Sequence, residues 1–261
     1  MVPCRGGWQR SVDVVLGLPD QVRGCLFDLD GVLTQTATVH AAAWKQMFDA
    51  YLRDRAEKSD TEFVPFDRVS DYDAYVDGKP RADGTRSFLE SRGIELPEGA
   101  DDEQPERYTV QGLGARKNTI LLRMIHRDGV TAYEGSVRYV HAARDAGLAR
   151  AVVSSSINCR DVLASAGIED LFDARIDGVV ARRDHLRGKP EPDTFLAGAH
   201  ALQVEPSQAA VFEDALAGVA AGRAGGFGFV VGVDRVGQAD ALRAHGADIV
   251  VTDLAELFDR R

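Results

Sequence analysis

Short apolar runs alternate with helix-like patterns along most of this 261-residue chain. Between the runs, apolar residues recur at three- and four-residue spacing, for example at Val137, Val140 and Ala143. Such runs are typical of strands buried on both faces of a parallel sheet, and the alternation predicts an α/β, Rossmann-like, doubly wound core. The predicted strands lie at residues 22–27, 149–153, 209–212, 229–233 and 249–251.

A long helical segment interrupts this alternation directly after the first strand. Apolar residues fall on one helix face over residues 44–52 and again over residues 120–125. No convincing strand pattern occurs between them, so we expect an inserted α-helical cap domain. The predicted division is an N-terminal extension at 1–20, a catalytic core at 21–35 and 133–261, and a helical cap domain at 36–132.

The composition is that of a globular protein, and its charge limits the partners. Hydrophobic residues make up 44% and charged residues 28%, which excludes a disordered chain. We find neither a run of ~20 apolar residues nor a signal peptide, so no membrane partner is expected. The net charge of −10 argues against a broad nucleic-acid surface but allows a small basic pocket. The cysteines Cys4, Cys25 and Cys159 are odd in number and widely separated, which predicts reduced thiols and a cytoplasmic location.

The strongest chemical signal is a pair of carboxylates, Asp28 and Asp30, after the first predicted strand. In doubly wound sheets the carboxyl ends of the strands form the ligand crevice. Two like charges there need a cation or a proton, and Mg²⁺ prefers oxygen ligands. One carboxylate could attack phosphorus while the other carries protons. The alternative is an Asx-type turn in which Gly31 permits the bend.

Three serines, Ser154, Ser155 and Ser156, follow the second predicted strand. Hydroxyl and backbone N–H groups at the start of a helix suit a phosphate. The alternative is simple N-capping of that helix by Ser156 or Asn158.

Two further motifs add a lysine and two acids. Lys189 precedes a proline, where it could neutralise a phosphoryl group or be an exposed loop lysine. Glu213 and Asp214 end another predicted core strand. They could complete a Mg²⁺ site or merely cap the next helix.

These four motifs, in this order, resemble the haloacid dehalogenase superfamily of phosphatases and phosphomutases, over nearly the whole chain from Val22 onward. The resemblance implies that Asp28 is the nucleophile that becomes an aspartyl phosphate and that Asp30 is the general acid/base. It assigns Ser154 and Lys189 to the transferring phosphoryl group. The implied Mg²⁺ ligands are Asp28, the backbone carbonyl of Asp30, Glu213 and Asp214.

The cap sequence is similar to the β-phosphoglucomutase family. His40 and Trp44 resemble residues of its first cap helix and share a face because they are four apart. Residues 77–81 resemble the family's substrate loop, with Arg81 gripping the non-transferring phosphate. Residues 116–118 resemble a loop whose lysine and asparagine touch the sugar phosphate. The implied substrate-binding residues are His40, Trp44, Gly78, Arg81, Lys117, Asn118, Ser155, Ser156 and Asn158.

One position departs from the family pattern. Ile157 stands where the family's Ser-Lys-Asn has lysine, which removes a cation near the non-transferring phosphate. Losing a charge-assisted contact costs roughly 1.5–3 kcal/mol. Arg160 and Lys79 are the candidates to compensate.

The resemblance implies interconversion of β-D-glucose 1-phosphate and glucose 6-phosphate, with β-glucose 1,6-bisphosphate as intermediate and activator. A sugar-phosphate phosphatase is the alternative, because it needs the same core residues. A non-catalytic phosphate-sensing protein is a third interpretation, which the intact acids and lysine disfavour. The expected partner is a small sugar phosphate bound by a monomer with Mg²⁺.

Overall fold

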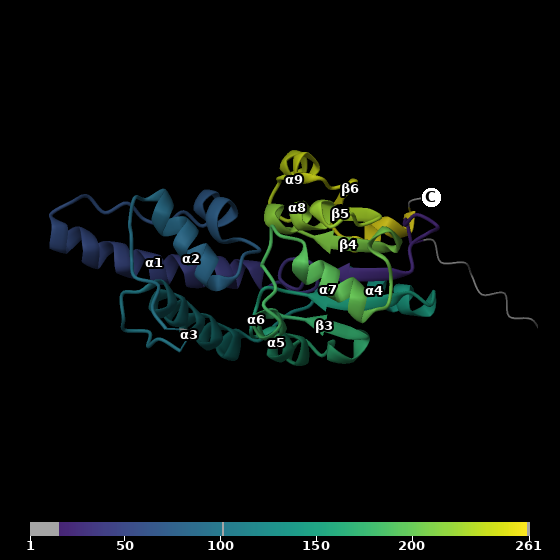
Figure 1. Cartoon of the computed structure of the whole chain (residues 1–261), viewed down its shortest axis with the longest axis horizontal. Helices are drawn as coiled ribbons and strands as arrows, with labels where there is room; N and C mark the ends of the chain where they lie inside the picture. The colour runs from purple at the N-terminus through teal and green to yellow at the C-terminus, as the bar shows by residue number, and fades with distance from the viewer. Residues whose placement is uncertain (1–15, 101, 260–261) are drawn as a thin grey trace, which may run out of the picture.

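The computed structural model describes residues 16–100 and 102–259 and has a parallel sheet at its centre (Figure 1). The sheet has six strands in the order β3-β2-β1-β4-β5-β6. The central strand β1 pairs with β2 on one side and β4 on the other, so their carboxyl ends meet at one edge. The strands are β1 (Gly24–Phe27), β2 (Ala149–Val153), β3 (Ala174–Ile176), β4 (Ala209–Glu213), β5 (Phe229–Val233) and β6 (Ile249–Val251).

Helices cover both faces of this sheet, which confirms the predicted doubly wound α/β fold. Side chains alternate between the faces, so Phe27 joins one hydrophobic cluster and its neighbour Leu26 joins the other. Helices α4 (Glu134–Asp145) and α5 (Cys159–Ser165) pack on the Phe27 side. The helices of the Leu26 side are α7 (Asp193–Ala201), α8 (Leu216–Ala224) and α9 (Ala239–His245).

Short helical turns complete the core. Helix α6 (Gly178–Arg183) follows β3 and precedes the loop that carries Lys189. The 3₁₀ helices are η2 (Glu169–Leu171), η3 (Pro206–Gln208) and η4 (Leu254–Asp259).

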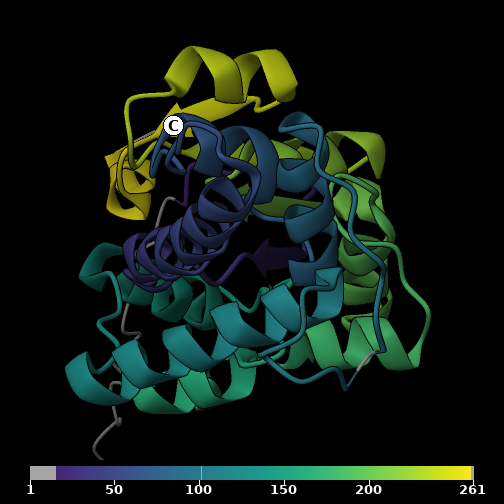
Figure 2. The ribbon, with the colours of Figure 1, turned by 90° about the vertical axis from the view of Figure 1, so that its left-hand side faces the viewer.

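A group of helices between β1 and α4 lies beyond the carboxyl edge of the sheet (Figures 1 and 2). It contains α1 (Ala37–Ser59), the π-helical turn η1 (Tyr72–Val76), α2 (Arg81–Ser91) and α3 (Val110–Asp128). Its centre is aromatic: the Phe48 ring lies 5.2 Å from Trp44, 5.3 Å from Phe66 and 4.2 Å from Phe88 between centroids. These aromatic rings belong to the same hydrophobic cluster as Phe27, so the packing is continuous from the helical group to the sheet.

The chain crosses between this helical group and the sheet at two adjacent points. The backbone N–H of Gln35 donates to the carbonyl of Thr131 at 2.9 Å, and that of Tyr133 donates to Leu33, also at 2.9 Å. The two connections therefore run side by side, held together by backbone hydrogen bonds.

The sequence missed β3 and the anchoring of the first described residues. Strand β3 is only three residues long and carries the half-buried Arg175 at its centre, so it lacks an apolar run. Leu16 is buried, and its carbonyl accepts a hydrogen bond from the Tyr139 hydroxyl at 2.7 Å. The predicted extension therefore packs on the core from Leu16 onward, and residues 1–15 lie outside the described residues.

Cys25 and Cys159 are both free and buried, while Cys4 is not among the described residues. Burial raises the pKa of the Cys25 thiol to about 12. Within the described part of the chain, no helix is long and apolar enough to cross a membrane.

Candidate active site

Charged side chains lie around a buried lysine at the carboxyl ends of the central strands. Asp28 follows β1, Ser154 follows β2 and Glu213 ends β4. The ammonium of Lys189 donates to Asp28 Oδ1 and to Glu213 Oε1, each at 2.5 Å. It also donates to the carbonyl of Val153 at 3.2 Å. The lysine thus joins the ends of three strands at a point without solvent access.

The ionisation of this cluster follows from its burial and its pairing. Burial by itself lowers the pKa of Lys189, but the charges of Asp28 and Glu213 outweigh it and raise the pKa above its ordinary value. Burial raises the pKa of Asp28, and the nearby Lys189 opposes that change. Burial also raises the pKa of Glu213 to about 7, again against Lys189. The lysine therefore stays charged and fixes the position of the Asp28 carboxylate.

A tight turn at Gly31 brings Asp214 against the loop after β1. Gly31 has a φ of 88°, in the left-handed region that favours glycine. A Cβ atom at Gly31 would lie only 1.7 Å from Asp214 Oδ2. Arg235 supports the turn, because its Nε donates to the Gly31 carbonyl at 2.7 Å. Glycine is required here both by the backbone and by the neighbouring carboxylate.

Three carboxylates in this region could hold a metal ion. Asp28, Glu213 and Asp214 each offer an oxygen within 4.8 Å of the others. Both oxygens of Glu213 already accept hydrogen bonds, from Lys189 and from the N–H of Ala215 at 3.0 Å. The Asp214 carboxylate accepts none from the described residues, and burial raises its pKa well above the ordinary value. A negatively charged, all-oxygen donor set fits a hard cation such as Mg²⁺.

Asp30 contacts the helical group at Thr36 and His40. The Thr36 hydroxyl donates to Asp30 Oδ1, and His40 Nε2 lies 3.6 Å from the same oxygen. On the other side of the ring, Lys117 Nζ lies 3.2 Å from His40 Nδ1. Burial and then the charge of Lys117 lower the pKa of His40 well below its ordinary value. Because an ammonium can only donate, Nδ1 of the neutral ring accepts and Nε2 carries its proton toward Asp30.

Two more pKa values in this contact are shifted by burial. Burial raises the pKa of Asp30, although the Thr36 hydrogen bond opposes the change. Burial lowers the pKa of Lys117 to about 7. Both shifts favour the uncharged forms, the protonated carboxyl of Asp30 and the neutral amine of Lys117.

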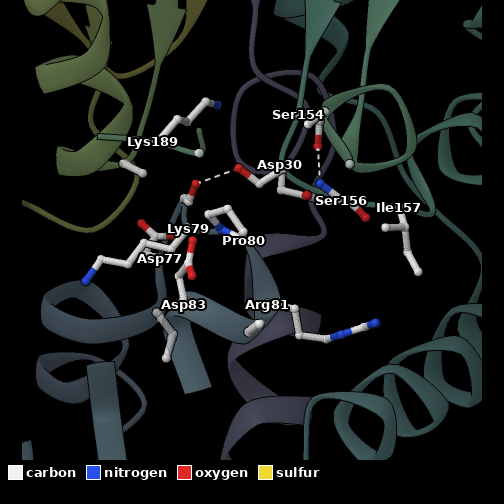
Figure 3. A pocket seen from close by; sticks show the side chains of 18 of the residues that line it. Asp30, Asp77, Lys79, Pro80, Arg81, Asp83, Ser154, Ser156, Ile157 and Lys189 are labelled. Carbon is white, nitrogen blue, oxygen red and sulfur yellow. Dashed lines mark hydrogen bonds between the residues drawn. The ribbon is translucent and has the colours of Figure 1, made fainter. Parts of the chain in front are cut away.

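Arg81 marks the opposite, outer end of the same pocket (Figure 3). The pocket has a volume of about 880 Å³ and reaches from Asp28 to Arg81. Arg81 begins α2 and lies along α3, where a Cβ at Gly114 would come within 3.3 Å of Arg81 Nε. Among the described residues, its guanidinium makes neither an ion pair nor a hydrogen bond. The pocket therefore has a cation at its outer end that no carboxylate neutralises.

Contacts between the helical group and the core close the sides of the pocket. Ser155 Oγ donates to the carbonyl of Gly78 at 2.8 Å, and Asn158 Nδ2 donates to Asn118 Oδ1 at 2.8 Å. Trp44 is 3% exposed, and its ring lies 4.9 Å from Lys117 Nζ.

Every site residue predicted from the sequence except Glu213 lines this pocket. Glu213 lies beneath it, bonded to Lys189.

Residues 116–118 are not a loop, as the sequence comparison suggested, but part of α3 (Val110–Asp128). Thr109 caps this helix by accepting a hydrogen bond from the N–H of Gly112 at 2.9 Å. The buried face extends continuously from Val110 to Ile125, so a helix buries more apolar surface than a loop would. Lys117 and Asn118 reach the pocket from consecutive positions of this helix.

The two side chains considered as substitutes for a lysine at position 157 have other partners. Arg160 Nε lies 3.3 Å from Glu169 Oε1, and Arg160 is not among the residues that line the pocket. Lys79 Nζ donates to Ser87 Oγ at 3.0 Å and points away from Arg81 (Figure 3). Neither therefore replaces the missing cation in this structure.

Two polar residues of the site were not singled out from the sequence. Thr36 holds Asp30, and Asp77 faces the core carboxylates from the opposite side of the pocket. Burial and then the charge of Glu213 raise the pKa of Asp77 to about 8. Asp77 is a carboxylate in a loop expected to bind an anion, and this mismatch was a signal that the sequence offered. Its proximity to Glu213 was not predictable, because the two residues are more than a hundred positions apart in the chain.

Comparison with known proteins agrees with this geometry. Residues 22–226 match the family model described as haloacid dehalogenase-like hydrolase. A β-phosphoglucomutase of Mycobacterium bovis is 59% identical over 247 residues, covering 94% of each chain. The β-phosphoglucomutase of Bacillus subtilis is 32% identical and covers 90% of this chain and 92% of its own. The chain therefore belongs to the haloacid dehalogenase-like hydrolases and, within them, to the β-phosphoglucomutase family.

A solved structure supports the same assignment. The crystal structure of a β-phosphoglucomutase from Clostridium difficile has a TM-score of 0.70 and 25% sequence identity to this chain. The match covers 90% of this chain and 93% of that one. The two chains thus share their fold over nine tenths of this chain.

Proposed function

We propose that this protein is a Mg²⁺-dependent β-phosphoglucomutase, which interconverts β-D-glucose 1-phosphate and glucose 6-phosphate. The observation that carries the proposal is one pocket with two anion-binding ends. Lys189 and Asp28 lie at the inner end, and Arg81 lies at the outer end without a counter-charge. The 59% identity to a β-phosphoglucomutase supports the choice of substrate.

At the inner end, Asp28 is the proposed nucleophile. One of its carboxylate oxygens attacks phosphorus, an oxygen–phosphorus bond forms, and the bond from phosphorus to the sugar oxygen breaks. Lys189 and the hydroxyl of Ser154 bind the transferring phosphoryl group as its charge spreads over the outer oxygens. The aspartyl phosphate transfers its phosphoryl group to the free hydroxyl of a bound sugar monophosphate, which gives the bisphosphate and frees Asp28. After the bisphosphate reorients, Asp28 takes the phosphoryl group at its other end, which restores the aspartyl phosphate and releases the isomeric monophosphate.

Asp30 is the proposed general acid/base. It donates a proton to the sugar oxygen that leaves and takes one from the sugar hydroxyl that attacks. Burial raises the pKa of Asp30, which favours the protonated form that the first step needs. The Thr36 hydroxyl holds this carboxyl in place when the cap meets the core, and His40 Nε2 lies 3.6 Å from it.

Asp28, Asp214 and Glu213, with the backbone carbonyl of Asp30, are the proposed Mg²⁺ ligands. When bound, the ion supplies electrostatic stabilisation of the transferring phosphoryl group. Since Glu213 is already bonded to Lys189 and Ala215, we propose that it also keeps the lysine in position.

We propose that residues 36–132 act as a cap that opens for substrate exchange and closes for phosphoryl transfer. The adjacent crossings at Gln35 and Tyr133 are the proposed hinges. Closure excludes water, which would otherwise hydrolyse the aspartyl phosphate. Contacts such as that of Ser155 with Gly78 belong to the closed arrangement.

We further propose that β-glucose 1,6-bisphosphate is both the intermediate and the activator, and that the enzyme works as a monomer. We place it in the cytoplasm, which the unpaired, buried thiols of Cys25 and Cys159 support. Its remaining partner is the small sugar phosphate.

Phosphorus NMR tests the proposal directly. The protein is mixed with Mg²⁺, β-glucose 1-phosphate and a trace of β-glucose 1,6-bisphosphate. We expect glucose 6-phosphate with little inorganic phosphate, and no conversion by the Asp28→Asn variant. The matched control is Asp184→Asn, because Asp184 is exposed and, among the described residues, forms an ion pair with the neighbouring Arg183 alone. Inorganic phosphate without glucose 6-phosphate would instead identify a sugar-phosphate phosphatase.

A further inference from the structure

A second unpaired guanidinium, that of Arg182, faces the same pocket. Arg182 lies in α6 and is among the residues that line the pocket. The other arginines of this segment are paired, Arg183 with Asp184 at 2.7 Å and Arg187 with Asp193 at 2.8 Å. Arg182 makes no ion pair or side-chain hydrogen bond within the described ranges. Its charge is therefore free to meet a ligand.

Arg182 and Arg81 act on one another across the pocket. Arg81 comes from the cap and Arg182 from the core. Burial and then the positive charge of Arg182 lower the pKa of Arg81. Two cations facing one cavity repel each other, and an anion bound between them removes that repulsion. The planar guanidinium group is well suited to binding the oxygens of a phosphate in pairs.

Ile157 lies next to α6, the helix that carries Arg182. Ile157 lines the pocket beside Ser156 and packs against the start of α6, since a Cβ at Gly178 would lie 2.9 Å from Ile157 Cγ2. Arg182 follows Gly178 by four residues and therefore lies on the same side of that helix. An apolar side chain at position 157 thus leaves room for a cation from the adjacent helix.

We propose that Arg182 binds the non-transferring phosphate of the sugar phosphate together with Arg81, in place of the cation that Ile157 lacks. This inference rests on the proposed two-phosphate function and adds a specificity-determining residue to it. The inner phosphoryl site does not involve Arg182, because Lys189, Asp28 and Glu213 form a closed set of contacts there.

The affinity for a sugar bisphosphate tests whether Arg182 contributes to the outer phosphate site. The Asp28→Asn variant serves as the parent, because it should bind β-glucose 1,6-bisphosphate with Mg²⁺ without turning it over. Adding Arg182→Ala should raise the Kd measured by calorimetry about ten- to hundredfold, as expected for the loss of a charge-assisted contact. The matched control is Arg183→Ala, which should leave the Kd unchanged because Arg183 pairs with Asp184.

A second pair of measurements separates a binding role from general damage. With Asp28 intact, Arg182→Ala should hydrolyse p-nitrophenyl phosphate, which has no second phosphate, with unchanged kcat/KM. Introducing Ile157→Lys into Arg182→Ala should restore most of the bisphosphate affinity by returning the cation to the neighbouring position. A bisphosphate Kd equal to that of Arg183→Ala, or an equal loss with p-nitrophenyl phosphate, overturns the proposal.

These outcomes are distinct from failure of the proposed function. If the unsubstituted protein released inorganic phosphate from sugar phosphates, the mutase would be excluded, yet the Kd of the bisphosphate would still report on Arg182. If glucose 6-phosphate formed and Arg182→Ala changed neither its KM nor the bisphosphate Kd, only the role of Arg182 would be rejected.

Discussion

The two ends of the pocket hold their cations in opposite ways. At the inner end, Lys189 has no solvent access and is bonded to two carboxylates at 2.5 Å. At the outer end, Arg81 is half-buried and Arg182 is exposed, and neither has a carboxylate partner among the described residues. A buried charge must be paired within the fold, whereas a charge that water still reaches can remain unpaired until a ligand binds.

This difference separates the part of the site that builds the fold from the part that selects the ligand. The inner cluster connects the ends of β1, β2 and β4, so it contributes to stability as well as to chemistry. The outer cations contribute little to the fold and gain their partner only with the substrate. Substitutions at the two ends should therefore separate activity from stability.

The largest effect on activity is expected for Asp28→Asn at the inner end. Loss of the nucleophile should lower kcat for glucose 6-phosphate formation by about 10⁴-fold or more. Thermal unfolding should be little changed, because an amide can still accept a hydrogen bond from Lys189. Residual activity within tenfold of the unsubstituted protein would exclude Asp28 as the nucleophile.

The largest effect on stability is expected for Lys189→Met. The change leaves Asp28 and Glu213 facing one another, buried and without a cation, which should destabilise the fold by about 3–5 kcal/mol. The matched change at the outer end, Arg81→Met, should alter the free energy of unfolding by less than about 1 kcal/mol. Chemical denaturation measures both, and equal losses would contradict the contrast between the two ends.

A third prediction concerns the turn that brings Asp214 toward the metal site. Gly31→Ala should weaken Mg²⁺ binding about tenfold or more, because the new Cβ would displace Asp214 Oδ2. Gly129→Ala is the control: Gly129 also has a positive φ, 75°, but nothing lies within 4 Å of its Cβ position. Calorimetric titration with Mg²⁺ compares the two variants, and equal affinities would mean that the turn is not needed for the metal site.

The last prediction concerns Lys117→Met, between the two ends. Burial lowers the pKa of Lys117 to about 7, so the unfolded chain binds more protons than the folded one between pH 7 and the ordinary lysine value. The stability of the unsubstituted protein should therefore rise with pH over that range. Lys117→Met should be more stable by about 1–3 kcal/mol at pH 7, with the gain disappearing toward pH 10.

The same charge should aid binding of the anionic substrate. For the unsubstituted protein, kcat/KM should fall as the pH rises through about 7, and Lys117→Met should be lower and lack that step. Thermal denaturation and kinetics at pH 6, 7.5 and 9 test both parts. A loss of stability on substitution would show that the lysine is compensated within the fold.

The sequence alone determined the parts of this protein that depend on local patterns. Apolar runs and helical spacing predicted five of the six strands and the inserted helices, because burial on one or both faces leaves a periodic signal. Asp28, Ser154 and Asp214 were predictable as a group, because the carboxyl ends of parallel strands meet at one edge. Strand β3 was not predictable, since three residues around Arg175 carry no apolar run.

Only the tertiary structure decided which charges are paired. Lys189 could have been an exposed loop lysine by sequence, and Arg182 one of several surface arginines. Folding places Lys189 between two carboxylates, whereas Arg182 lines the pocket without an ion-pair partner in the described part of the chain. Yet 161 residues separate Lys189 from Asp28 and 101 separate Arg182 from Arg81. Electrostatic energy depends on distance in space and on exposure to water, and a linear pattern of residues reports neither.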